Sequence, residues 1–175
     1  MNLNLRQIKV RASKIKSKNL ALRKQLWPTL DSDLLWDRTQ QKGFTTIPRP
    51  MPYILQIMDH LAPKGKPVSE TYLSLWCRVF DESLVVIQNP SELAFESGFT
   101  GQRAVTTWAS RMSYLENMGF IATKDGASGK YNYVLLYNPY IVIKKQHAAK
   151  KIQETEYNVL FARAQDVGAT DLLED

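Results

Sequence analysis

The fold is decided by residues 89–137, which read NPSELAFESGFTGQRAVTTWASRMSYLENMGFIATKDGASGKYNYVLLY. Asn89 is a good helix N-cap, Pro90 suits the first helical position, and Glu92 stands where it can reach back to the cap. Gly98 favours the left-handed conformation that ends a helix. This part of the sequence therefore predicts a short helix of about two turns, followed by a turn.

A second, longer helix is expected over residues 101–118, with Thr100 as its cap. Its apolar residues recur at steps of three and four, which places them on one face: Val105, Trp108, Ala109, Met112 and Leu115. The opposite side is polar and carries no carboxylate before Glu116. One face of this helix is thus expected in the core and the other in solvent.

Two strand patterns then flank a loop that contains two glycines. They cover residues 120–123 and 131–137, which are rich in aromatic and β-branched residues, and Pro139 is expected to end the second. Upstream, the sequence predicts a helix that is capped by Ser69 and a strand over residues 83–87. The resulting order is helix, strand, helix, helix, strand, strand.

The segments Ser97–Thr100 and Arg111–Ile121, with the glycine-rich basic hairpin after them, resemble the winged helix-turn-helix of bacterial regulators and plasmid replication initiators. The resemblance covers about residues 69–137. It implies an α+β, mostly helical fold, namely a winged helix with an N-terminal basic arm and a C-terminal helix. It also implies double-stranded DNA as the partner.

A DNA-reading helix enters the major groove with its N-terminal part, where arginine pairs with guanine and glutamine with adenine. The residues expected to read bases are Gln102, Arg103, Thr106 and Thr107. Those expected to contact the DNA backbone are Thr100, Ser110, Arg111, Lys124 and Lys130. The alternative is a polar face that solvent alone contacts.

The formal net charge of +6 is concentrated at the N-terminus. Residues 1–24 contain no acid and eight basic residues: Arg6, Lys9, Arg11, Lys14, Lys16, Lys18, Arg23 and Lys24. The apolar residues between them show no convincing helical or strand period, although Ser17 or Asn19 suits the cap of a short helix. We expect a partly disordered arm over residues 1–25, either folding on nucleic acid or solvated without a partner.

The predicted organisation places a short helical and proline-rich connection at residues 26–52 and the winged-helix domain at residues 53–140. Residues 141–143 are expected to extend the strand pattern, and one helix is expected from Lys144 to about Gly168. That C-terminal helix either packs on its own domain or pairs with its copy in a homodimer.

Other classes of function find little support in the sequence. Cys77 is alone, and His60 and His147 are far apart, so neither a disulfide nor a metal site is expected, and no cofactor is implied. No long apolar segment or leader pattern occurs, so the expected location is cytoplasmic, without a membrane. The loop at residues 125–131 lacks the glycine spacing of a phosphate loop, and no catalytic cluster is evident. We therefore expect a DNA-binding transcriptional regulator or plasmid-type replication or maintenance factor; the alternative is a winged-helix protein-interaction module.

Overall fold

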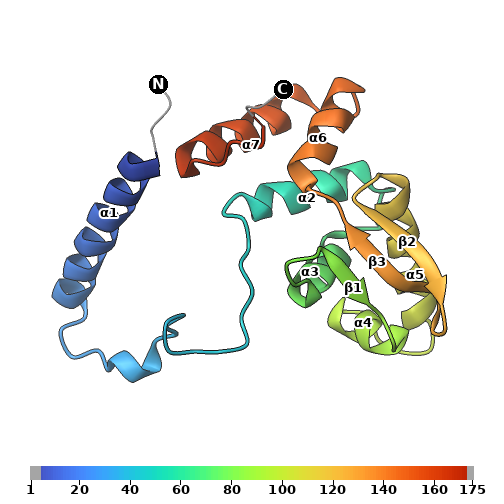
Figure 1. Ribbon diagram of the computed structural model, residues 1–175, viewed down its shortest axis with the longest axis horizontal. Coiled ribbons are helices and arrows are strands. Elements are labelled where there is room, and N and C mark those ends of the chain that lie inside the picture. The colour runs from blue at the N-terminus through green and yellow to red at the C-terminus, as the bar shows by residue number, and fades with distance from the viewer. Residues whose placement is uncertain (1–4, 173–175) are drawn as a thin grey trace. The chain divides into compact units, whose positions relative to one another are not determined.

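The computed structural model describes residues 5–172, and the side chains of residues 5–9, 11 and 12 lie outside that description. The chain divides into two compact units, Met1–Phe44 and Thr45–Asp175. The second unit combines helices with a three-stranded antiparallel sheet (Figure 1). The expected α+β class is therefore confirmed.

The first unit contains a long helix where the sequence predicted an irregular arm. This helix, α1 (Leu5–Leu26), is 22 residues long, whereas the sequence predicted at most a short helix capped by Ser17 or Asn19. Most of its residues are good helix formers, and neither glycine nor proline interrupts it before Pro28. A short 3₁₀ turn, η1 (Ser32–Leu34), follows, and its cap Asp31 accepts a hydrogen bond from Asp33 N.

The second unit follows the predicted order of elements from its second helix onward. Its elements are α2 (Met51–Leu61), α3 (Ser69–Arg78), β1 (Leu84–Val86), α4 (Pro90–Glu96), α5 (Ala104–Asn117), β2 (Ile121–Gly126), β3 (Gly129–Leu136), α6 (Pro139–Ala148) and α7 (Glu154–Val167). The helix, strand, helix, helix, strand, strand order runs from α3 to β3.

The sheet has the order β1-β3-β2, so the hairpin strand β3 lies in the middle. Val85 pairs with Val134, and both are buried, which identifies the face that packs on the helices. On this side the Trp108 and Tyr131 rings meet edge to face, with their centroids 5.6 Å apart. The sheet is therefore fixed to α5 through its central strand.

The C-terminal segment folds as two helices. The expected strand character at residues 141–143 is wrong, because Asn138 caps a new helix by accepting a hydrogen bond from Tyr140 N at 3.0 Å, and Pro139 stands at its first position. The helix α6 ends at Ala148, and Lys150 has a positive φ of 58° in the connection to α7.

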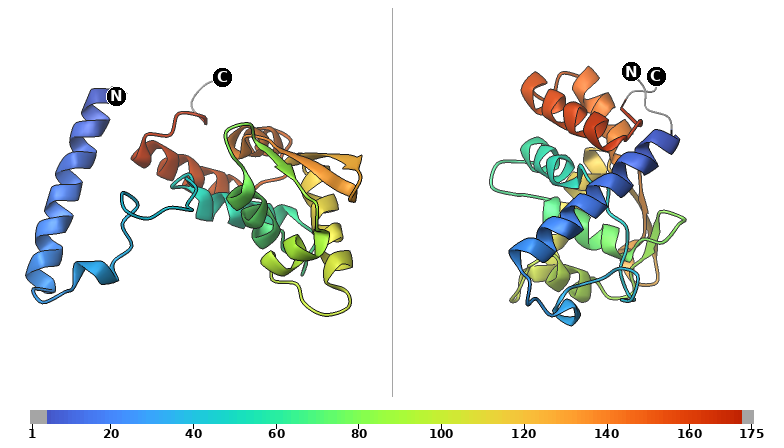
Figure 2. Two further views of the ribbon diagram at one scale, coloured as in Figure 1. Left: turned by 60° about the horizontal axis from the view of Figure 1, so that its bottom comes forward. Right: turned by 90° about the vertical axis from the view of Figure 1, so that its left-hand side faces the viewer.

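The helix α7 packs on its own domain, the first of the two arrangements that the sequence left open. Figure 2 shows it beside α2, and an ion pair joins Glu156 to His60 of α2. The His147 ring of α6 stacks on Tyr157, with centroids 3.7 Å apart. The compact unit is thus larger than the predicted domain of residues 53–140, and it also includes Thr46, whose carbonyl accepts from Trp76 Nε1.

Candidate nucleic-acid interface

The turn between α4 and α5 is built by glycines in the left-handed conformation. Gly98 has a φ of +78°, and the bonds from Gly98 N to Phe95 O and from Phe99 N to Ala94 O close the end of α4. Asn89 caps the start of α4 by accepting from Ser91 N at 3.1 Å. The predicted cap and stop of this helix are therefore both confirmed.

The helix α5 begins later than predicted. Gly101 has a φ of +79°, and Ala104 N bonds to Gly101 O at 3.1 Å, so Arg103 occupies the cap position in place of Thr100. The expected helix boundary at residue 101 is wrong, because the left-handed glycine extends the turn by three residues. Gln102 consequently lies in the turn that leads into α5.

The four predicted base-reading residues differ in exposure. Gln102, Arg103 and Thr106 are exposed, and Thr107 is half-buried. The first turn of α5 carries no acidic residue. The turn and the first turns of α5 thus present amide, guanidinium and hydroxyl groups without a carboxylate among them.

The predicted backbone-contacting residues on α5 are partly engaged within the protein. Ser110 is half-buried, and its Oγ donates to Thr106 O at 3.1 Å. Arg111 is half-buried too, and its guanidinium carbon lies 5.6 Å from the centre of the Phe99 ring. This contact with the α4–α5 turn restricts the reach of Arg111 toward a ligand. Thr100, by contrast, is exposed.

The β2–β3 hairpin carries the two predicted lysines in exposed positions. Lys124 lies on β2 beside an irregularity in the register that ends at Gly126, and Lys130 lies on β3 with Nζ 5.2 Å from the centre of the Tyr131 ring. Because Tyr131 also contacts Trp108 of α5 and donates to Ala109 O at 3.2 Å, the hairpin is tied to α5.

A further cation, which was not predicted as a site residue, lies against α5. Lys66, in the loop between α2 and α3, donates from Nζ to Tyr114 Oη at 3.0 Å and lies over the Tyr114 ring. The loop PKGKP marks a basic turn in the sequence, but its position beside α5 depends on the packing of α2 and α3. Periodicity along the chain gives no signal for such a contact.

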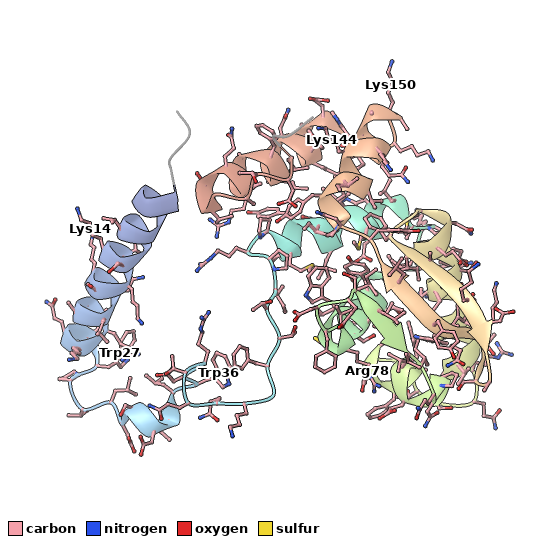
Figure 3. All side chains as sticks on the ribbon, in the orientation of Figure 1. Lys14, Trp27, Trp36, Arg78, Lys144 and Lys150 are labelled. Carbon is pink, nitrogen blue, oxygen red and sulfur yellow. The ribbon has the colours of Figure 1, made fainter. Side chains whose placement is uncertain are left out.

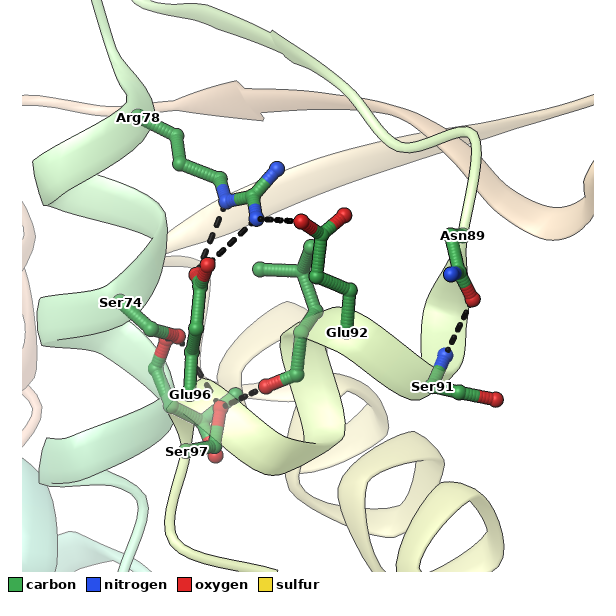
Figure 4. A network of polar contacts seen from close by, with 9 residues as sticks. Ser74, Arg78, Asn89, Ser91, Glu92, Glu96 and Ser97 are labelled. Atoms are coloured by element: carbon green, nitrogen blue, oxygen red, sulfur yellow. Dashed lines mark hydrogen bonds and ion pairs between the residues drawn. The ribbon is translucent and has the colours of Figure 1, made fainter.

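A polar network holds α4 against α3 (Figure 4). Arg78 of α3 donates from Nε and Nη2 to the two carboxylate oxygens of Glu96, and Nη2 also lies 3.4 Å from Glu92 Oε1. The hydrogen bonds between Arg78 and Glu96 lower the pKa of the Glu96 carboxyl and raise the pKa of the Arg78 guanidinium. Below them the buried Ser97 hydroxyl donates to Leu93 O and contacts Ser74 Oγ at 3.0 Å. These contacts fix α4 and hence the turn that precedes α5.

The eight basic residues of residues 1–24 lie along α1 and not in an irregular arm. Those with described side chains are all exposed: Lys14, which Figure 3 labels, and Lys16, Lys18, Arg23 and Lys24. Arg6, Lys9 and Arg11 belong to the same set, but their side chains lie outside the described residues.

Among the described residues, no helix has both the length and the apolar character to cross a membrane. The same part of the chain contains no group of three or more histidine, cysteine or carboxylate side chains arranged to hold a metal ion. No protein-family model, curated protein or solved structure matches this chain.

Proposed function

We propose that residues 45–175 form a winged-helix domain that binds double-stranded DNA, as in a transcriptional regulator or a plasmid-type replication or maintenance factor. The turn before α5 and the first turns of α5 enter the major groove. The β2–β3 hairpin is the wing, and it lies against the DNA backbone.

The observation that carries this proposal is the set of exposed polar side chains at the start of α5, none of them acidic, with the anchored hairpin and its two exposed lysines beside α5. Gln102, Arg103 and Thr106 are exposed there, and these side chains match base edges. Lys124 and Lys130 are exposed on the hairpin, where they neutralise phosphates and position the domain without reading sequence. Lys66 adds a further lysine next to α5.

The test compares the full-length protein with two arginine variants on duplex DNA. A preferred site is first selected from random duplexes, and binding is then measured by fluorescence anisotropy across a salt series. Arg103→Ala removes a bidentate base contact and is expected to cost about 1–3 kcal/mol on the preferred site, with little effect on mixed sequence. Arg49→Ala, an exposed arginine before α2, is the matched control and is expected to bind like the parent.

Equal loss of affinity on the preferred and mixed duplexes would contradict base reading by Arg103. A lack of any duplex binding at physiological salt would remove the DNA proposal altogether.

A second candidate function is a protein-interaction module, and the outer face of the sheet favours it. Leu84 pairs with Leu135, and Val86 pairs with Tyr133, and all four side chains are exposed on the side away from the buried Val85–Val134 pair. Contiguous exposed apolar side chains often mark a protein contact. This candidate predicts that a partner protein co-purifies with the parent chain and no longer does so with Leu135→Lys. It also predicts that the parent chain does not bind duplex DNA. A homodimer through the outer side of α7, where Val159 is exposed, accords with either function.

A further inference from the structure

The helix α1 has a regular apolar stripe that becomes evident once the segment is known to be helical. Residues at alternating steps of three and four lie on one line of the helix: Leu5, Ile8, Ala12, Ile15, Asn19, Leu22 and Leu26. Of those with described side chains, Ile15, Leu22 and Leu26 are each about half exposed, at 50, 48 and 56%. In the described part of residues 1–44, no other element covers this stripe.

The spacing of the stripe is that of a coiled-coil seam. A strict seven-residue repeat with two apolar positions gives a narrow line of contacts, whereas a helix that lies on a globular core or on a membrane has a broader apolar face. Ala12 and Asn19 narrow the stripe further, and no aromatic residue occurs within α1. Asn19 occupies a core position, where a single asparagine typically fixes register and partner number.

The residues that flank the seam are basic on both sides. Lys9, Lys16 and Arg23 follow one edge, and Arg11 and Lys18 follow the other. In a parallel pair of identical helices, Arg11 and Lys18 would face Lys16 and Arg23 of the copy, and an antiparallel pair would also set basic residues against basic ones. A second copy of this chain is therefore a poor partner.

The helix also lacks the opposite-charge pairs that stabilise an isolated helix. No acidic residue occurs before Asp31, so α1 has no oppositely charged pair four residues apart, and Lys14 and Lys18 form a repulsive pair at that spacing. Most of the stability of a helix in a protein comes from the packing of its apolar face, and the described apolar side chains of the α1 seam are exposed. A partner with acidic flanks would cover the seam and neutralise the charges that oppose the helix.

We propose that α1 is one strand of a two-stranded coiled coil with an acidic heptad helix of another protein. That helix has apolar core residues, glutamates at the flanking positions and a polar side chain opposite Asn19. Five of the eight basic residues of this segment border the seam, and nucleic acid would leave the apolar seam uncovered. These two observations favour an acidic helix over phosphates, and the inference is independent of the DNA surface on residues 45–175.

The experiment uses the full-length protein and a fluorescent synthetic peptide as the probe. The peptide has the length of α1, leucine at the core positions, asparagine opposite Asn19 and glutamate at the flanking positions. Anisotropy at physiological salt is expected to show binding, and circular dichroism is expected to show a helical signal larger than the sum of the separate components. A peptide with lysine at the flanking positions is expected not to bind.

Two leucines of α1 provide a matched pair of variants. Leu22 lies on the seam and Leu20 lies off it, two residues away, with exposed fractions of 48 and 40%. Leu22→Gln is expected to weaken peptide binding about ten-fold or more, because a leucine buried in the seam is lost. Leu20→Gln is expected to change binding less than about two-fold.

Absence of binding to the acidic peptide, or equal effects of the two leucine variants, would overturn the proposal. Self-association of the protein that Leu22→Gln abolishes and Leu20→Gln preserves would also overturn it, in favour of a second copy. Displacement of the peptide by duplex DNA, with the same DNA affinity in both leucine variants, would assign the basic residues of α1 to phosphates.

Discussion

Replacing Gly126 by alanine tests how the hairpin is held next to α5. A Cβ at this position would lie 2.0 Å from Asn132 Oδ1 and 2.7 Å from a ring carbon of Tyr133. Tyr133 is exposed and can turn aside, but Asn132 is 4% exposed, and its Nδ2 donates to Ile87 O at 2.9 Å. The substitution therefore displaces the amide that joins β3 to the segment just after β1.

The expected cost follows from the group that loses its partner. When the Asn132 amide moves, the carbonyl of the buried Ile87 loses the hydrogen bond from Asn132 Nδ2, and such a loss costs about 1–3 kcal/mol. Alanine lowers the conformational entropy of the unfolded chain, which stabilises the folded protein by at most about 1 kcal/mol. We expect Gly126→Ala to lower the free energy of unfolding by about 1–2 kcal/mol.

The assay is urea unfolding followed by far-UV circular dichroism, with a double-mutant cycle as the control. Asn132→Ala removes the same hydrogen bond by itself, and it also removes the atom that the new Cβ meets. Gly126→Ala should therefore cost little in the Asn132→Ala background. An equal cost in both backgrounds, or no cost in the parent, would refute the steric argument.

Two further changes test the supports around the candidate interface. Arg78→Ala should lower the free energy of unfolding by less than about 1 kcal/mol at pH 7, since the Arg78 carboxylate contacts are partly exposed. Because Arg78 lowers the pKa of Glu96 below its ordinary 4.5, that contribution is present above pH 4.5 and is lost as the pH falls further. Urea unfolding at a series of pH values should thus show the two proteins converging below pH 4.5, and a gap that widens there would contradict the assignment. Asn138→Ala removes the α6 cap and should cost about 1 kcal/mol; Asn158→Ala, an exposed change inside α7, should cost less, and the reverse order of midpoints would count against the cap.

The elements of the second unit were largely predictable because their ends carry local chemical signals. Asn89 and Pro90 predicted the start of α4, and the structure shows the same chemistry at Asn138 and Pro139, which begin α6. At the second site the proline was interpreted only as the end of a strand, and the β-branched run at residues 141–143 favoured a strand. The cap decided the outcome, since the branched side chains of Val142 and Ile143 are buried on a helix.

The helix α1 was missed for a different reason. Its helical period is carried by only a few apolar residues, and Val10 and Leu20 lie off that line, so the segment lacks the broad apolar face by which amphipathic helices are identified. A search for a seven-residue repeat finds the period, because the repeat tolerates Ala12 and Asn19 at core positions. The periodicity of a helix that packs on a globular core is therefore the wrong criterion for a helix whose described side chains are all exposed.

The candidate interface was predictable as a set of residue types but not as a surface. Gly101 moves the start of α5 to Ala104, so Gln102 and Arg103 extend from a turn, and their reach depends on how that turn is fixed. The position of that turn depends on the position of α4. Arg78 of α3 fixes α4 through its hydrogen bonds to Glu96. The spacing of residues along one helix cannot predict the position of this turn, because that position is set by contacts between different helices. If DNA reading is the function, Arg78→Ala should therefore weaken discrimination between duplexes through the position of Arg103, even though Arg78 itself lies outside the proposed DNA contacts.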